Sequence, residues 1–218
     1  MALSEEYKKN LNIIIKNVFK MSVIVQNILS STINGLIEQR EELLIESHSG
    51  EEILDILQKD TEDLSIKTIA LFQPVGKDLR LIVSNILLAS DLERIGDLIR
   101  NIGKASKEII QFPPLKPYVD IPKMTQLCIE MLKIIIKSML DENYEIAVEE
   151  AKKDDIIDKL NNKIWQELLK YMIKDTKNIN QASKIIYISK QLERIGDHIT
   201  NIAERIYYIK TGKIVDLN

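Results

Sequence analysis

Apolar residues recur every seven positions along two stretches of the chain, and this pattern predicts two long helices. The first row consists of Leu81, Leu88, Ile95, Ile102 and Ile109, and the second of Ile188, Ile195, Ile202 and Ile209. A companion row in the second stretch consists of Ile185, Leu192, Ile199 and Ile206. A helix that carries both apolar rows of a heptad packs lengthwise against partner helices.

Both stretches contain the same hexapeptide. The sequence LERIGD occupies residues 92–97 and returns unchanged at 192–197, and Asn101-Ile102 is matched by Asn201-Ile202. A repeat period longer than one helix indicates a duplicated structural unit. We therefore expect two related halves, each a three-helix bundle.

Similar apolar patterns predict the remaining helices, over about 4–39, from there to Phe72, and over 78–110, 121–140, 143–174 and 181–210. Residues 47–50 have the local signals of a turn, but apolar residues on both sides also allow one continuous helix with a costly glycine. The segment 73–77 ends the second helix, and Asp78 can cap the next one. The expected fold class is all-α.

A proline-rich segment separates the two halves. Residues 112–118 contain three of the five prolines of the chain. Proline and the residue before it disfavour helix, so we expect a linker here. The predicted domains are residues 1–111, a linker at 112–120, and residues 121–218.

Charge and composition exclude several classes of protein. The chain has 33 acidic and 30 basic residues and no long basic run, which disfavours direct binding of nucleic acid. No apolar stretch of signal-peptide or membrane-spanning type is evident, so we expect a cytoplasmic protein that meets membranes only through partners. The single cysteine, Cys128, lies in an apolar helical pattern and is interpreted as a core residue, with redox use as the alternative.

Pairs of acidic residues are the candidate functional groups. Each LERIGD motif contains one pair, and the preceding helix of each half contains another: Glu51 and Asp55, Glu93 and Asp97, Asp154 and Asp158, Glu193 and Asp197. At about 1.5 Å of rise per residue, the two pairs of each half come to the same height on antiparallel helices. We expect four carboxylates to converge in each half, on the outer face of the LERIGD helix, about 130° from the apolar seam.

Four converging carboxylates need a counter-charge. Arg94 and Arg194 project about 100° away from the neighbouring glutamates and serve that face poorly. Sites made only of carboxylate oxygens suit hard or borderline divalent cations, so the sequence predicts one metal site in each half. The open alternative is a surface of paired or solvated charges. Gly96 and Gly196 indicate either room for such a site or tight helix packing, and His198 is either a metal ligand or a surface residue.

Several motifs together resemble the PhoU family of phosphate-transport regulators. They are Gln73-Pro74 followed by Asp78-Leu79-Arg80, the two LERIGD sequences, and Asn201-Ile202-Ala203-Glu204. The resemblance covers nearly the whole chain. It implies two tandem three-helix bundles, divalent or iron-type metal clusters on the four acidic pairs, and negative control of phosphate uptake and phosphate-starvation signalling.

The resemblance also implies partners and a helix boundary. The partners are the ATPase of the Pst phosphate transporter and the sensor kinase PhoR, and we further expect a homodimer. The alignment makes Gly50 part of a continuous second helix. The segment 173–180 departs from the family pattern, because it has neither the Gln-Pro nor the Asp-Leu-Arg element.

Two other functions stay open at this point. A helical-bundle metalloenzyme would use ExxH pairs on core-facing positions, and no such pair follows either LERIGD. A metal-free helical adaptor would need no carboxylate site at all.

Overall fold

The computed structural model describes residues 5–217, apart from the side chains of Glu46 and Ser47, and these residues form helices, turns and loops without strands. The helices are α1 (Glu5–Glu38), α2 (Glu41–Phe72), α3 (Gly76–Ile109), α4 (Asp120–Leu140), α5 (Tyr144–Ala151), α6 (Asp154–Lys174), the short 3-10 helix η1 (Thr176–Asn178) and α7 (Ile179–Thr211). The expected all-α class is confirmed.

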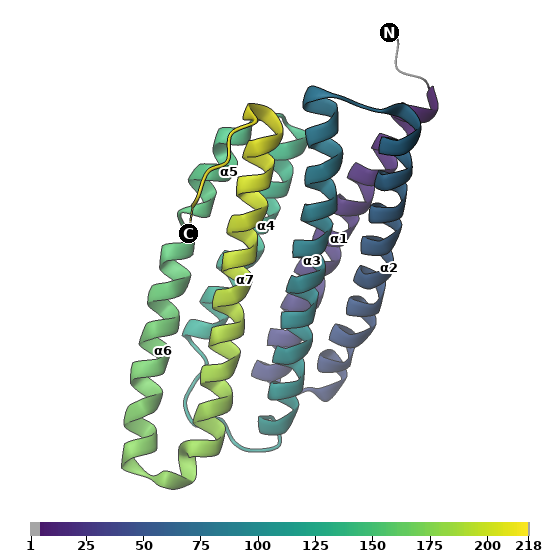
Figure 1. The fold of residues 1–218 in the computed structure, drawn as a ribbon. Coiled ribbons are helices and arrows are strands. Elements are labelled where there is room, and N and C mark those ends of the chain that lie inside the picture. Colours follow the sequence, from purple (N-terminus) through teal and green to yellow (C-terminus); the bar gives the residue numbers. More distant parts are fainter. Residues whose placement is uncertain (1–4, 218) are drawn as a thin grey trace.

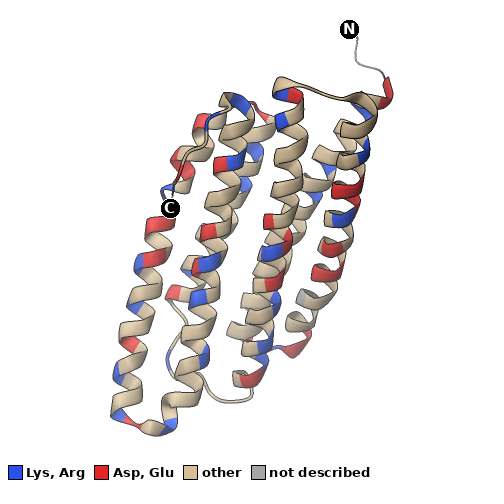
Figure 2. Cartoon of the chain, in the orientation of Figure 1, with Lys and Arg blue, Asp and Glu red and all other residues tan. Residues whose placement is uncertain are grey.

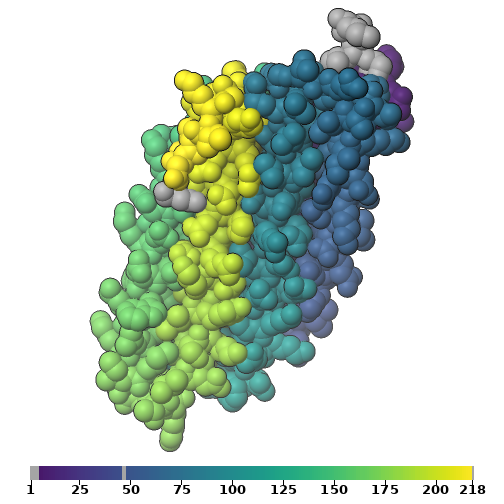
Figure 3. All heavy atoms as spheres, in the orientation of Figure 1, coloured from purple at the N-terminus to yellow at the C-terminus, as the bar shows by residue number. Residues whose placement is uncertain are grey.

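The helices run up and down along one long axis in two bundles (Figure 1). In the first bundle, α1, α2 and α3 pack against one another, and in the second α4, α5 and α6 pack around α7. The bundles meet mainly where α3 lies beside α7, and the space-filling view shows these two helices in contact along much of their length (Figure 3). The two LERIGD helices therefore form the centre of the molecule.

The heptad rows of α3 and α7 are buried as expected, except that Leu81 at the start of the α3 row is only partly buried. Leu88, Ile95 and Ile102 on α3 are fully shielded from solvent. On α7 both rows, from Ile185 to Ile209, are shielded in the same way. Fully burying one such side chain contributes about 1.5 to 3 kcal/mol, which explains why these rows determine how the two bundles pack.

A continuous α2 replaces the turn suggested by the local signals at residues 47–50. A Cβ at Gly50 would collide with the Cγ2 atom of Ile28 on α1. The glycine is therefore required by the close approach of α1 and α2, and its cost of about 1 kcal/mol in a helix is the price of that packing.

The connection between α2 and α3 differs from the prediction at Asp78. Gln73 ends α2 in the left-handed conformation (φ 47°), with its backbone N–H donating to the carbonyl of Ile69. The N-cap of α3 is Val75, which makes no side-chain capping bond. Asp78 is not a cap: it lies inside the first turn of α3, where its negative charge interacts favourably with the helix dipole.

The helix predicted over 143–174 is interrupted and forms α5 and α6, within a second half that keeps the expected arrangement of three helices. Lys152 and Lys153 separate α5 from α6, and the backbone N–H of Lys153 and of Ile156 each donate to a carbonyl three residues earlier. Such tightened bonds bend a helix. The bend places Asp154 at the very start of α6.

The proline-rich linker is tied to both bundles. The side-chain amide of Gln39 donates to the carbonyls of Ile110 (2.8 Å) and Phe112 (2.7 Å), and that of Gln181 donates to the carbonyl of Pro113 (3.0 Å). Lys116 forms an ion pair with Glu167 on α6. These contacts hold the crossing between the halves against the ends of the helices.

Helix α1 is long and apolar enough to cross a membrane by length and composition alone. One face of α1, with Ile14, Met21 and Leu36, is buried against neighbouring helices, whereas Ile13, Phe19, Val23 and Ile37 are exposed. The core helix of a soluble protein can pass the same test. Basic and acidic residues are interspersed along the helices (Figure 2).

Candidate metal centres

The first acidic cluster lies between α2 and α3. Glu51 is buried, and an ion pair joins its Oε1 to Nη1 of Arg100 (2.8 Å). The other guanidinium nitrogen, Nη2, donates to Oδ1 of Asp97 (2.6 Å). Burial, and then the charges of Asp97, Asp55 and Glu51, raise the pKa of Glu93, although Arg94 lowers it in part. Asp55 and Asp97 are thus close enough to the two glutamates to raise the pKa values of Glu51 and Glu93.

The second cluster lies between α6 and α7. Burial, and then the charges of Asp197, Asp158 and Glu193, raise the pKa of Asp154 to about 7. Burial and Glu193 likewise raise the pKa values of Asp158 and Asp197. Lys190 pairs with Glu193 and is half-exposed. The structure therefore brings together the four carboxylates predicted for each half.

The LERIGD acids are less exposed than expected. The side chains of Glu93, Asp97 and Glu193 have exposed fractions of only 19%, 28% and 14%. The predicted outer face is covered because α2 packs on that side of α3, and α6 packs on that side of α7. This correction matters chemically, since carboxylates held out of water depend on a counter-charge more than solvated ones do.

The two motif glycines have different neighbours. A Cβ at Gly96 would lie 2.6 Å from Cδ1 of Leu54 on α2, so this glycine serves helix packing. A Cβ at Gly196 would collide with Oδ1 of Asp154, and it would also lie 3.2 Å from Cδ1 of Ile157. Gly196 therefore serves both packing and the acidic cluster, which the sequence could not distinguish.

The fit of a metal ion differs between the halves. Among the described residues, no three His, Cys, Asp or Glu side chains already surround a common point as a metal would require. In the second cluster, however, Oδ1 of Asp154 and Oε2 of Glu193 are buried and without a hydrogen-bond partner. Buried oxygens of this kind are costly unless a cation or donor satisfies them. The all-oxygen donor set fits a hard divalent cation once these side chains turn toward one another.

Arg100 and Lys190 are the site residues that sequence reasoning missed. Arg100 follows Asp97 by three positions and Glu93 by seven, so helical spacing places all three side chains on one face. Lys190 precedes Glu193 by three positions in the same way. By contrast, Arg94 makes only long contacts, 3.9 Å to Glu93 and 4.0 Å to Asp97, as its angular position predicted.

His198 contacts the other half of the molecule. Its Nδ1 lies 3.2 Å from Oδ1 of Asp91 on α3, and Nε of Arg205 donates to Oδ2 of the same aspartate (2.6 Å). Asp91 is buried between α3 and α7. The histidine thus belongs to a polar contact that joins the bundles.

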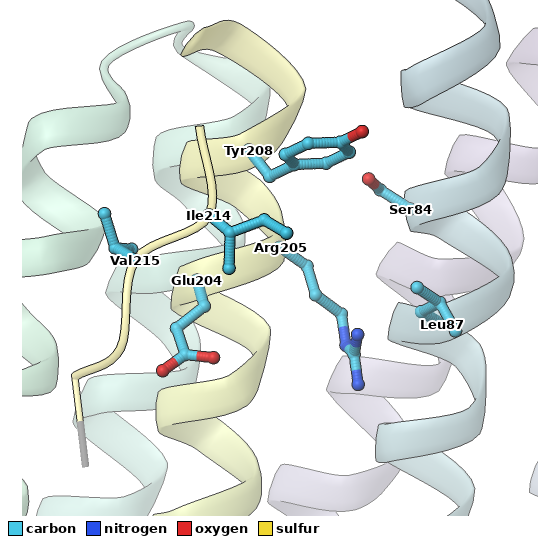
Figure 4. A pocket seen from close by; sticks show the side chains of 7 residues that line it. All are labelled: Ser84, Leu87, Glu204, Arg205, Tyr208, Ile214 and Val215. Carbon is cyan, nitrogen blue, oxygen red and sulfur yellow. The ribbon is translucent and has the colours of Figure 1, made fainter. Parts of the chain in front are cut away.

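A cavity of about 200 Å³ lies farther along α7 (Figure 4). Ser84 and Leu87 line it from α3, Glu204, Arg205 and Tyr208 from α7, and Ile214 and Val215 from the tail. It is displaced from Asp197 by about 10 Å along the helix, at 1.5 Å per residue. Arg205, its basic residue, is already paired with Asp91. The cavity is not part of either acidic cluster.

The fold and these clusters define the class: a duplicated helical-bundle protein with a carboxylate cluster between two helices of each bundle. Comparison with known families identifies it further. The profile of the PhoU domain matches residues 18–106 and again 121–206. The chain belongs to the PhoU family.

Relatives match over nearly the full length. The "Phosphate-specific transport system accessory protein PhoU homolog" of Deinococcus radiodurans is 32% identical over 210 residues, covering 96% of this chain and 99% of the relative. A protein of the same description from Aquifex aeolicus is 35% identical over 200 residues, covering 92% of this chain and 90% of the relative.

Solved structures agree in fold. The regulatory protein PhoU of the phosphate transport system from Streptococcus pneumoniae superposes with a TM-score of 0.87 at 26% identity, covering 96% of this chain and 99% of the other. PhoU from Pseudomonas aeruginosa superposes with a TM-score of 0.90 at 24% identity, covering 95% and 100%. The family is one of transport accessory proteins, so the metalloenzyme alternative is not retained.

Proposed function

We propose that this protein restrains phosphate uptake and phosphate-starvation signalling by contacting the ATPase of the Pst transporter and the sensor kinase PhoR. The observation that supports this function is the match of both PhoU domains in one chain, with relatives aligned over nearly their full length. The proposed location is the cytoplasm. The expected homodimer and the domain boundaries at 112–120 remain part of this proposal.

We also propose that the protein binds divalent metal through its carboxylate clusters. The residues that would hold it are Asp154, Asp158, Glu193 and Asp197 in the second half, and Glu51, Asp55, Glu93 and Asp97 in the first. A bound cation supplies positive charge that joins carboxylates of two helices. The two orphaned oxygens, of Asp154 and Glu193, support this proposal for the second cluster.

The regulatory proposal is tested in a bacterial strain that lacks its own PhoU. Expression of this chain should restore restrained phosphate uptake and low expression of phosphate-starvation genes at high phosphate. Pull-down should recover the Pst ATPase and the kinase, with an unrelated transporter ATPase as the control. If the chain associated with neither partner and failed to restore phosphate control in the strain that lacks PhoU, the proposal would be refuted.

Metal binding is tested separately by chelation. A metal that binds only the folded state stabilises it by about 2.7 kcal/mol at a concentration of 100 times its dissociation constant. Removing metal should therefore lower the melting temperature, and adding it back should restore it. If neither treatment changes melting and elemental analysis finds no metal, the metal-free adaptor is the correct function class.

A further inference from the structure

The two clusters differ at the position that follows each LERIGD motif by three residues. The first half has Arg100 there and the second half has Thr200. Arg100 forms bonds to carboxylates of both helices, Glu51 on α2 and Asp97 on α3. Thr200 is fully buried, and its hydroxyl has no hydrogen-bond partner in the described part of the chain. Threonine cannot supply the charge that arginine supplies.

Each cluster has one basic side chain beside it, and the two clusters differ mainly in where that side chain lies. Lys190 contacts the second cluster through Glu193 alone, and its side chain is 53% exposed. Arg100 is less exposed, at 30%, and it bridges two helices as a planar fork. Arg100 therefore links the carboxylates of α2 and α3 in the first cluster, as a bound metal ion would.

The buried polar atoms that have no hydrogen-bond partner also differ between the two clusters. In the second cluster they are acceptors, namely Oδ1 of Asp154 and Oε2 of Glu193. In the first cluster, within residues 5–217, the unsatisfied buried atom is a donor, Nε of Arg100. The second cluster therefore has a cation at its edge, Lys190, but none between its two helices in the position that Arg100 takes in the first cluster.

We propose that Arg100 takes the place of a divalent cation in the first cluster, so that this chain binds metal at the second cluster alone. The inference rests on the proposed metal binding and replaces the sequence expectation of one metal site in each half. A divalent ion at the first cluster would have to displace Arg100 from a buried glutamate and would be repelled by the guanidinium if it stayed. No such competitor contacts Asp154.

The test measures Mn²⁺ content of the purified full chain by equilibrium dialysis and elemental analysis, with calorimetry for stoichiometry. Replacing Glu193 by Gln and Asp197 by Asn keeps side-chain shape while removing two anionic ligands. This pair should abolish Mn²⁺ binding in the otherwise natural chain. If about half of the bound Mn²⁺ remained, both clusters would bind metal and the inference would be wrong.

Exchanging the repeat residues provides the reciprocal test. Arg100→Thr should create a second site and about double the bound Mn²⁺, and adding Glu93→Gln with Asp97→Asn should cancel that gain. Arg94→Thr is the matched control, since this exposed arginine makes only long contacts and its loss should add no site. Circular dichroism melting establishes that each variant is folded.

The outcomes separate the two proposals. Unchanged Mn²⁺ stoichiometry in folded Arg100→Thr would overturn the role of Arg100 while leaving metal binding at the second cluster intact. Should Arg100→Thr fail to fold, the Glu193 and Asp197 pair still decides between one site and two. A natural chain that binds no Mn²⁺ would instead refute the proposed metal binding and, with it, this inference.

Discussion

Replacing Asp154 by Asn should change how the stability of the metal-free protein depends on pH. Burial and four neighbouring carboxylates raise the pKa of Asp154 to about 7. In the unfolded chain an aspartate has a pKa of about 3.9. Between these values the folded state holds more protons than the unfolded state, so the free energy of unfolding falls as the pH rises through the window.

The size of the effect follows from the pKa difference. About three pKa units at about 1.36 kcal/mol each set an upper bound of about 4 kcal/mol. Asp197 and Asp158 titrate together with Asp154, and the cluster is partly solvated, so we expect about half of that, about 2 kcal/mol. Asp154→Asn should therefore stabilise the protein by about 2 kcal/mol near neutral pH and change little near pH 4.

The assay is urea unfolding followed by circular dichroism, in the presence of chelator, from about pH 4 to about pH 7.5. Glu145→Gln is the matched control, because Glu145 is exposed on α5 and is not among the acids that perturb Asp154. The control should keep the natural pH dependence, whereas Asp154→Asn should flatten it. If the free energy of unfolding depended on pH in the same way in all three proteins, the argument that Asp154 destabilises the fold near neutral pH would be refuted.

Two further predictions concern packing and the contact between the bundles. Gly96→Ala should destabilise the fold by about 1 to 2 kcal/mol in chemical unfolding, because overpacking against Leu54 outweighs the gain in helix propensity. The penalty should shrink when Leu54 is also Ala, and an equal penalty in both backgrounds would contradict the contact. Asp91→Asn should cost about 2 kcal/mol, since it leaves the partly buried Arg205 without its carboxylate. The same cost in a chain that already carries Arg205→Gln would show that this pair is not its source.

Much of the architecture could be predicted from local patterns. The heptad rows of α3 and α7 fixed which faces would be buried, because an apolar row at helical spacing has no favourable place except against another helix. Counting residues from the turns placed Glu93 near Asp55, and Glu193 near Asp158, since the rise of a helix is constant. The duplicated hexapeptide indicated the two halves and the family.

Tertiary structure alone decided which neighbours the repeated residues meet in each half. The same glycine of the motif meets Leu54 in one bundle and Asp154 in the other, because the neighbouring helix, absent from the local sequence, determines what fills the space. The burial of the acids was likewise set by the packing of α2 and α6, which a single-helix projection does not include.

Arg100 could be recognised as the counter-ion only once the structure showed that it contacts Glu51. Arg100 is one of many basic residues on a helix surface, and spacing alone relates it to Asp97 but not to Glu51, which lies on another helix. The sequence by itself determined the helices, their apolar seams and the meeting of four carboxylates in each half. Only the packing of helices decided which carboxylates receive a guanidinium and which remain without a partner, because charge compensation depends on distances between segments far apart in the chain.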